Sequence, residues 1–361
     1  MKNFKIAVMP GDGIGREIMT PTLEIIDMAI HGLDIVLSYD HIEAGAQYYA
    51  ETGNAFPESH FERAEWADAI LLGAMGDPNI RYPDGTEIGP QHDLRKRLGL
   101  YAGVRPCKTI PSLPLPLIDE RTKNLDFVIV RESTEGLFAF PRGFTTDDDE
   151  YKHNLMRISK TVSKKLFNFS FNLARRRHQQ GRGKNLVSHI DKANVLSSQH
   201  HAREWFYEVA KDHKDVNASH KYVDFAALDM VRRPWEFDVM PTENQYGDIL
   251  SDLAAALMGG MGMAPSGEIG DNHALFQPCH GSAPDIAGMG KANPTGMILS
   301  AAMMLDYLSD KHNCPEAAIA GKRIEDAVLE AYEKEKLLPY ELNGTSGLNE
   351  ISNAIKKQII L

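Results

Sequence analysis

The chain has 361 residues, of which 43% are hydrophobic and 25% are charged, and its formal net charge at pH 7 is −11. This length and composition predict two globular domains or one large α/β unit. The acidic balance argues against a general nucleic-acid or membrane-surface binder, because both of these partners attract basic proteins.

The three cysteines, Cys107, Cys279 and Cys314, are few and far apart. Their spacing fits neither a disulfide framework nor a zinc site, which indicates a reducing compartment. Residues 1–10 contain no long apolar region of the signal-peptide kind. No uncharged apolar run reaches the roughly 18 residues of a membrane-spanning helix. We therefore expect a cytoplasmic protein.

Short runs rich in β-branched residues alternate with stretches of helical periodicity along the chain. The first pair is a predicted strand at residues 4–10 and a predicted helix at residues 15–32. Such alternation predicts an α/β fold with a mainly parallel sheet covered by helices. Further strands are predicted at residues 67–74, 125–132, 184–190 and 237–243, and further helices at residues 163–178, 197–212, 292–310 and 324–337.

Three other segments stand out by composition or pattern, and of these residues 140–161 lack a clear period. The proline-rich residues 106–123 predict a rigid surface crossing between two halves of the protein. Residues 140–161 are expected to form a loop, or an arm that orders against a partner subunit. The basic run 174–184 predicts the solvated end of a helix, with RNA contact as the less favoured alternative.

The glycine-rich turn "PGDGIG", residues 10–15, follows the first predicted strand. Its spacing is not that of the Rossmann fingerprint, and no acidic residue closes a convincing second strand about 20 residues further on. Taken alone, the turn predicts a tight strand-to-helix connection and not a cofactor site.

Three arginines, Arg95, Arg105 and Arg131, lie in "LRKRLGLYAGVRP" and at the end of the strand "VIVRESTEG". The guanidinium group grips a carboxylate at two points. Three such groups converging on one place would suit a di- or tricarboxylate, whereas each one taken singly is more often a surface cation.

Lys192 follows an apolar strand in "SHIDKANVL". A lysine in a desolvated cleft can act as a base, although a lysine at a strand end usually faces solvent. Asp224 stands in the middle of the apolar stretch "KYVDFAALDMV", where a carboxylate needs a partner.

Asp248 and Asp252 are four residues apart in "TENQYGDILSD", which precedes an apolar run. On a helix they would share one face and repel each other unless a cation lay between them. Acidic residues favoured by a helix dipole are the other explanation. Asp224 is a candidate third ligand, and a set of oxygen ligands favours magnesium or manganese over zinc.

The stretch "QPCHGSAPDIAGMGKANPTG", residues 277–296, is dense in small and turn-forming residues and contains His280, Asp285 and Asn293. Such a loop can wrap a nucleotide, with Asp285 accepting hydrogen bonds from ribose hydroxyls. The alternative is a long structural turn.

Assembled, these motifs resemble the β-decarboxylating dehydrogenases, a family that includes isocitrate, 3-isopropylmalate, homoisocitrate and D-malate/tartrate dehydrogenases. The resemblance covers nearly the whole length. It implies a two-domain isopropylmalate dehydrogenase-like fold. The first domain, residues 1–100 and 259–361, would hold both termini and most of the dinucleotide site. The central domain, residues 101–258, would hold a dimer arm and the metal and substrate residues. The motifs occur in family order: "PGDGIG", "LRKRLGLYAGVRP", "VIVRESTEG", "DKANVL", "FDVMPTEN", "YGDILSD", "APSGEIGD", "HGSAPDIAG" and "ANPTGMILSAAMMLDYL".

The resemblance also implies an activity, namely oxidative decarboxylation of a 2-hydroxy dicarboxylate or tricarboxylate with NAD and Mg²⁺ or Mn²⁺. The enzyme would be a homodimer with shared active sites. Lys192 and Asp224 would serve catalysis. Asp248 and Asp252 would bind the metal in one subunit, and Asp224 and Lys192 would be supplied by the other. Arg95, Arg105 and Arg131 would hold the malate-like part of the substrate, and His92 would lie near its variable group. The implied dinucleotide site comprises Ile14, Asn194, His280, Gly281, Ser282, Ala283, Asp285 and Asn293.

Two positions depart from the family pattern. The tyrosine that serves as an acid would fall at Phe138, whose ring cannot transfer a proton. The segment that reads the variable group of the substrate is "IGPQHD", in which Gln91 and His92 match neither the leucines of isopropylmalate enzymes nor the arginine of homoisocitrate enzymes. Phe138 leaves an alternative open, a catalytically impaired member that acts as a binding or regulatory subunit.

Overall fold

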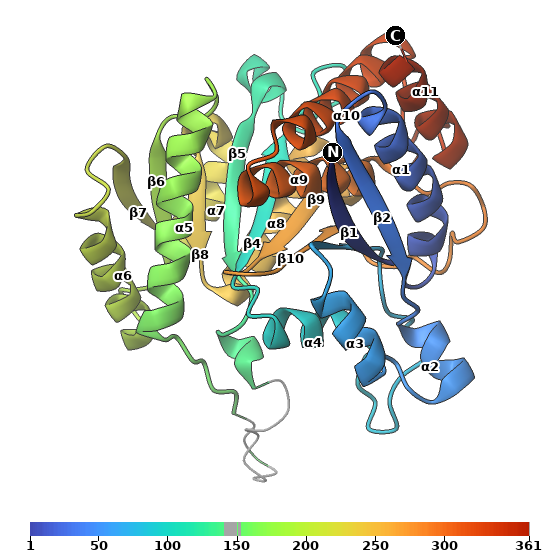
Figure 1. Ribbon diagram of the computed structural model, residues 1–361. Helices are drawn as coiled ribbons and strands as arrows, with labels where there is room; N and C mark the ends of the chain where they lie inside the picture. The colour runs from blue at the N-terminus through green and yellow to red at the C-terminus, as the bar shows by residue number, and fades with distance from the viewer. Residues whose placement is uncertain (141–149, 151–152, 361) are drawn as a thin grey trace. The chain divides into compact units, whose positions relative to one another are not determined.

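The computed structural model describes residues 1–140, 150 and 153–360, which divide into two compact units. The first unit consists of residues 1–99, 110–116 and 258–361, and the second unit consists of residues 100–109 and 117–257. The N-terminal strand and the C-terminal helix both belong to the first unit (Figure 1).

The first unit is built on a five-stranded part of the sheet, in the order β2-β1-β3-β10-β9. Adjacent strands from β2 to β10 pair in parallel, and β9 pairs antiparallel with β10. The last residues of β1 and all of β3 are buried, as expected for parallel strands covered on both faces. The strands are β1 (Lys2–Met9), β2 (Ile35–His41), β3 (Ala69–Leu72), β9 (Pro265–Ile269) and β10 (Ala274–Pro278).

The helices of the first unit cover this sheet because each has an apolar face. In α1 (Ile14–Ile30) the buried residues recur every three or four positions, among them Ile18, Ile25 and Ile26. Helix α9 packs on β9 and β10, and α1 and α10 pack on α9. The other helices are α2 (Ala46–Thr52), α3 (Glu58–Glu65), α4 (Pro90–Arg97), α9 (Thr295–His312), α10 (Pro315–Lys334) and α11 (Leu348–Ile360), with 3₁₀ turns η4 (Met261–Met263) and η5 (Tyr340–Leu342).

The second unit is also built on five strands, in the order β4-β5-β8-β6-β7. β4 pairs antiparallel with β5, and the remaining neighbours pair in parallel. With the helices that cover them, the strands form a mixed α/β architecture, which agrees with the predicted fold class. The strands are β4 (Ala102–Lys108), β5 (Asp126–Glu132), β6 (Leu186–Asp191), β7 (Asn217–Tyr222) and β8 (Val239–Thr242).

Helix α5 of the second unit packs on strands β5, β8 and β6 and runs along them (Figure 1). Ser159 caps its N-terminus by accepting the backbone N–H of Val162 through its hydroxyl, and the buried side of the helix includes Phe167 and Phe171. Both rings contact Phe206 of α6. The helices are α5 (Lys160–Gln179), α6 (Ser197–Ala210), α7 (Val223–Arg232) and α8 (Asn244–Met258), with 3₁₀ turns η1 (Glu120–Asn124), η2 (Leu137–Ala139) and η3 (Pro234–Glu236).

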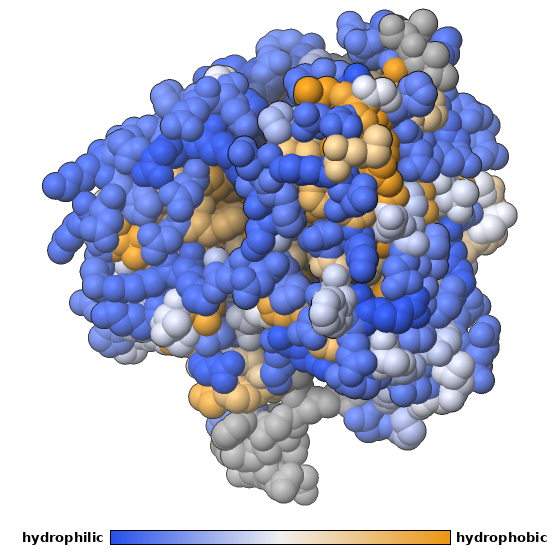
Figure 2. All heavy atoms as spheres, viewed as in Figure 1, coloured by the Kyte–Doolittle hydropathy of each residue, from blue (hydrophilic) through white to orange (hydrophobic). Residues whose placement is uncertain are grey.

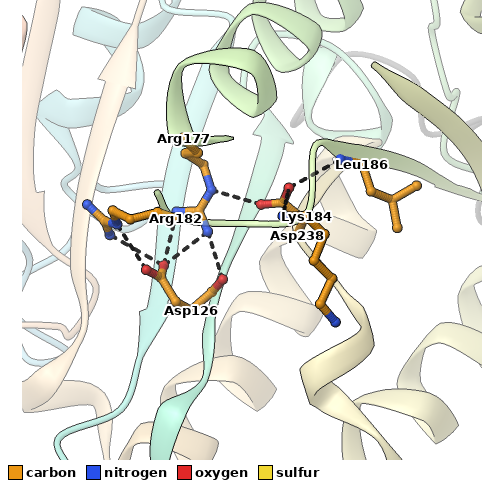
Figure 3. A network of polar contacts seen from close by, with 6 residues as sticks. All are labelled: Asp126, Arg177, Arg182, Lys184, Leu186 and Asp238. Carbon is orange, nitrogen blue, oxygen red and sulfur yellow. Dashed lines mark hydrogen bonds and ion pairs between the residues drawn. The ribbon is translucent and has the colours of Figure 1, made fainter. Parts of the chain in front are cut away.

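A buried ion network ties the end of α5 to the starts of β5, β6 and β8. The Arg177 side chain donates to Asp238 at 2.9 Å and to Asp126 at 3.0 Å. The Asp238 carboxylate also accepts the backbone N–H groups of Lys184 and Leu186. Figure 3 shows the residues of this network, Asp126, Arg177, Arg182, Lys184, Leu186 and Asp238.

We expect Arg177→Leu to lower the free energy of unfolding by about 3 kcal/mol or more, because it leaves the fully buried Asp238 without this counter-charge. Chemical denaturation followed by far-UV circular dichroism measures the change. Arg175→Leu is the matched control, since Arg175 lies on the same helix but pairs with the solvent-accessible Asp215. It is expected to change little. Equal effects of the two substitutions would contradict the assignment.

The predicted strands correspond to β1, β3, β5, β6 and β8, and the predicted helices to α1, α5, α6, α9 and α10. The proline-rich segment 106–123 is not only a crossing, because residues 106–108 belong to β4 and residues 120–124 to η1. In the predicted arm at 140–161, residues 141–149 and 151–152 lie outside the described residues.

Hydrophilic side chains cover most of the face shown in Figure 2, and hydrophobic side chains form separate patches on it. No helix in the described part of the chain is long and apolar enough to cross a membrane.

Candidate functional site

Lys192 and Asp224 form a pair in the second unit. Lys192 follows β6 directly, and its ammonium nitrogen lies 2.7 Å from Asp224 Oδ1 in the first turn of α7. This hydrogen bond holds the pKa of the Asp224 carboxyl below its ordinary value. The sequence suggested an apolar environment for Asp224, but its side chain is 68% exposed, because the stretch around it is a helix with an outward face.

The backbone around Lys192 is fixed by buried polar side chains. The Lys192 N–H donates to Gln199 Oε1 at 2.5 Å. The neighbouring Asp191 is fully buried and accepts the N–H of Ala193 and the side chain of Arg203. The end of β6 is therefore held firmly where the lysine leaves the sheet.

Asp248 and Asp252 lie one turn apart on α8, as the four-residue spacing predicted. They share an outward face of this helix with Ile249, whose side chain is 61% exposed. Partial burial raises the pKa of the Asp252 carboxyl, and the charge of Asp248 raises it further. The two carboxylates thus repel each other.

The donor set on α8 fits a divalent cation of the Mg²⁺ or Mn²⁺ kind, because a cation would relieve this repulsion and both donors are oxygens. Within residues 1–140, 150 and 153–360, no group of three or more His, Cys, Asp or Glu side chains is arranged to hold a metal. One chain therefore offers Asp248 and Asp252 at one place, and Asp224 at another.

Two of the three predicted arginines lie beside these aspartates. Arg131, at the end of β5, forms an ion pair with Asp248. Arg105 of β4 projects from the same face of the β4–β5 ladder, two residues along the register. The charges of both arginines act on the Asp252 carboxyl and partly oppose the rise in its pKa that burial and Asp248 cause. The second unit therefore brings two cations and two carboxylates together.

Phe138 lies at the same place, on η2. Its ring centroid is 5.7 Å from the guanidinium carbon of Arg131, and its side chain is 45% exposed. The position that departs from the family pattern is therefore next to a candidate substrate-binding arginine, and it presents no ionisable group there.

The third arginine, Arg95, belongs to the first unit. It lies on α4 and forms a buried ion pair with Glu268 of β9, at 3.0 Å. Gln91 is one turn before Arg95 on the same helix, and its Oε1 atom is buried without a hydrogen-bond partner in the described structure. His92 is exposed on the neighbouring side of α4.

Several of the predicted dinucleotide residues meet in the first unit. The N–H of Ile14 donates to the carbonyl of Ser282 at 2.8 Å, and the hydroxyl of Ser282 donates to the carbonyl of Gly76 at 2.5 Å. His280 is engaged with the carbonyl of Gly281 through Nδ1, and burial lowers the pKa of its ring. Ala283 follows with a positive φ of 38°.

The remaining three predicted residues have different surroundings. Asp285 is exposed in the first unit. Asn293 is buried there, and its amide donates to Glu341 at 2.7 Å while its carbonyl accepts the N–H of Thr295. Asn194 is exposed after β6 in the second unit. The roles of all these residues stay predictions.

Sequence reasoning missed three buried polar residues that support the site: Gln199, Glu268, and Asn244, which accepts from Arg131 Nε at 2.8 Å. Glu268 had a recognisable signal, because it is the only acid in the small-residue run "APSGEIG". A charge in such a run needs a partner if the run is buried.

The whole chain is similar to known proteins. Residues 5–356 match the model of the isocitrate/isopropylmalate dehydrogenase family. A 3-isopropylmalate dehydrogenase of Aquifex aeolicus is 40% identical over 88% of both chains, and one of Methanothermobacter thermautotrophicus is 38% identical over 99% of both. The crystal structure of an isocitrate dehydrogenase from Methylococcus capsulatus superimposes with a TM-score of 0.86 at 31% identity, covering 99% of this chain and 100% of that one. A β-decarboxylating dehydrogenase from Thermococcus kodakarensis gives 0.80 at 32% identity, covering 99% and 96%.

Proposed function

Because the chain belongs to the isocitrate/isopropylmalate dehydrogenase family, we propose that it oxidatively decarboxylates a 2-hydroxy dicarboxylate or tricarboxylate, using NAD and Mg²⁺ or Mn²⁺, in the cytoplasm. The observation that carries the proposal is the group on β4, β5 and α8. There Arg105 and Arg131 lie beside Asp248 and Asp252, so anion-binding and cation-binding groups adjoin. A chelated hydroxy acid needs both.

The chain supplies the groups for each part of this reaction. Arg105 and Arg131 would bind the carboxylates of the substrate. The Lys192–Asp224 pair would remove the hydroxyl proton, which Lys192 can take up only as the neutral amine. When bound, the dinucleotide accepts the hydride and the divalent cation polarises the hydroxyl and keto oxygens. Asp248 and Asp252 would hold that cation, with Asp224 of the partner subunit as a further ligand. The first unit would hold most of the dinucleotide site.

A homodimer with shared active sites is part of the proposal. Apolar residues line the outward face of α7, including Leu228 and Val231, and Asp224 stands on that same face one and two turns away. On α8, Ile249 stands between the two candidate metal ligands. These exposed apolar faces support a dimer in which they are buried against a second copy of the chain. Such a dimer would bring Asp224 of one chain close to Asp248 and Asp252 of the other.

An assay of NAD reduction tests the proposed function. The substrates are D-malate, tartrate, homoisocitrate, isocitrate and 3-isopropylmalate, each with and without Mn²⁺, and carbon dioxide release is measured in parallel. We expect metal-dependent turnover with NAD preferred over NADP, because Asp285 would repel a 2′-phosphate. Equal efficiency with both dinucleotides would contradict the role of Asp285.

Within this panel we expect a polar or small variable group on the substrate. The buried Oε1 atom of Gln91 needs a hydrogen-bond donor, which a hydroxyl provides and an isopropyl group does not. His92, when protonated, could meet a third carboxylate. A highest kcat/KM with 3-isopropylmalate would contradict this inference, although the relatives bear that name.

A second candidate function rests on Phe138, namely a catalytically impaired member that acts as a binding or regulatory subunit. Dinucleotide binding without turnover of any acid in the panel would favour it. Under the leading proposal, hydride transfer survives and protonation of the enolate is slow, because a benzyl ring donates no proton.

Phe138→Tyr is therefore expected to raise kcat about tenfold or more, since a positioned acid contributes roughly 10² to 10⁴-fold. Stopped-flow measurement of the hydride step should show no gain in that step. Phe56→Tyr, which adds the same hydroxyl to a ring in the first unit, is the control. An unchanged or slower Phe138→Tyr variant would mean that proton donation at this position does not determine the rate.

A further inference from the structure

Asp12 occupies the middle of the turn "PGDGIG", and the proposed function gives its side chain no role. The side chain is almost fully buried, with 1% of its surface exposed. Its carboxylate accepts three backbone N–H groups from two distant parts of the first unit. The donors are Ala46 at 2.9 Å, Gln47 at 2.9 Å and Gly76 at 2.8 Å. These three N–H groups stabilise a negative charge on the buried carboxylate.

These contacts lie where dinucleotides bind in open α/β sheets, at the carboxyl ends of parallel strands. Residues 10–15 follow β1, residues 73–76 follow β3, residues 42–47 follow β2 and residues 279–285 follow β10. The four strands are neighbours in the order β2-β1-β3-β10. Asp12 directly joins the first three of these connections.

The fourth connection is joined through Gly76. While the N–H of Gly76 donates to Asp12, its carbonyl accepts the hydroxyl of Ser282. Ser282 in turn accepts the N–H of Ile14 through its own carbonyl. A continuous path of hydrogen bonds therefore leads from Asp12 to the predicted dinucleotide residues Ile14 and Ser282.

The backbone is packed so closely around these hydrogen bonds that the connections have little room to shift. A Cβ atom on Gly45 would lie 2.5 Å from the Asp12 carboxylate, and one on Gly13 would lie 2.1 Å from the Ser282 carbonyl oxygen. Both glycines have positive φ. Only glycine combines this backbone conformation with such close approach.

We infer that Asp12 is a positioning residue for the dinucleotide, acting through Gly76 and Ser282 without touching the cofactor itself. The inference rests on the proposed function and adds a determinant of cofactor affinity that is separate from the groups proposed to act on the hydroxy acid. The consequence is selective. Loss of Asp12 weakens dinucleotide binding and leaves the affinity for the hydroxy acid unchanged.

Asp12→Asn tests this inference, because asparagine keeps the shape but replaces one acceptor oxygen by an NH₂ group that faces N–H donors. We expect the Kd for NADH, measured by fluorescence without substrate, to rise about tenfold to a hundredfold, as the loss of charge-assisted hydrogen bonds implies. The KM for NAD should rise in parallel, and the KM for the acid should stay within about twofold. Hydrogen–deuterium exchange should increase in residues 277–290.

Two further variants make the outcome decisive. Gly45→Ala places a methyl group against the Asp12 carboxylate, and Gly45 is not one of the predicted dinucleotide residues. This variant should also lose NADH affinity and keep its affinity for the hydroxy acid. It tests the inference even if Asp12→Asn does not fold. Asp27→Asn, at an exposed carboxylate that accepts from Tyr39, should change nothing. Unchanged NADH affinity in both Asp12→Asn and Gly45→Ala would overturn the inference while wild-type turnover still supports the proposed function. A wild-type protein that binds no NADH would overturn both.

Discussion

Lys192→Met is expected to lower kcat by about 10³-fold, within the range that general acid–base groups contribute. Methionine keeps much of the length of the side chain but cannot take up the hydroxyl proton. Because the backbone of Lys192 is held by Gln199 and its flank by Asp191, the substitution should not displace the end of β6. Steady-state rates at saturating substrate measure the loss.

Binding of NADH to the Lys192→Met variant should be close to that of the wild type, which separates loss of chemistry from loss of the site. Lys164→Met is the matched control, since Lys164 also pairs with a carboxylate, Glu208, but on the exposed side of α5 and α6. A fall of less than threefold in kcat for Lys192→Met would remove this lysine from the chemistry.

Asp248→Asn is expected to weaken binding of Mn²⁺ at least about tenfold, the scale of loss typical of residues around a metal. The amide retains one oxygen but lacks the negative charge. Isothermal titration with Mn²⁺ measures the change. Asp252→Asn should have a similar effect, because both carboxylates lie on one face of α8.

Asp326→Asn is the control for metal binding, because Asp326 pairs with Lys322 one turn away on an exposed face of α10. Asp248 also pairs with Arg131, so the Asp248→Asn variant could alter substrate affinity as well. Asp252→Asn separates the two effects. Unchanged Mn²⁺ affinity in both α8 variants would rule out these aspartates as metal ligands.

Helices and strands with a clear hydrophobic pattern could be predicted from the sequence. Strands that form only because a neighbouring strand pairs with them could not. β5 contains the apolar run "FVIV", and α1 and α5 have regular buried faces. By contrast, β7 reads "NASHKY" and β9 reads "PSGEI", neither of which favours a strand. These segments are strands because β6 and β10 pair with them.

β4 shows the same principle more sharply. It contains Pro106, and proline argues against a strand in a paired sheet. The strand nevertheless pairs with β5 over seven residues, with Pro106 opposite Val128. The local preference is overridden by the antiparallel partner, which follows later in the chain.

Within the candidate site, residue types could be predicted but most contacts could not. The spacing of Asp248 and Asp252 implied a shared helix face, because both residues lie in one local element. The pairing of Arg95 with Glu268, or of Asp12 with Gly76, joins residues far apart in sequence. A single sequence shows that a buried charge needs a partner and does not identify the partner.

The outward apolar faces of α7 and α8 bear on how the protein behaves at low concentration. Under the proposed dimer, Leu228, Val231 and Ile249 are shielded only while two chains are associated. Dilution below the dissociation constant would then separate the metal-binding carboxylates of the two chains. The same dissociation would expose these apolar side chains to water. Specific activity and thermal midpoint would both fall with dilution, so assays at nanomolar and micromolar protein would describe different species.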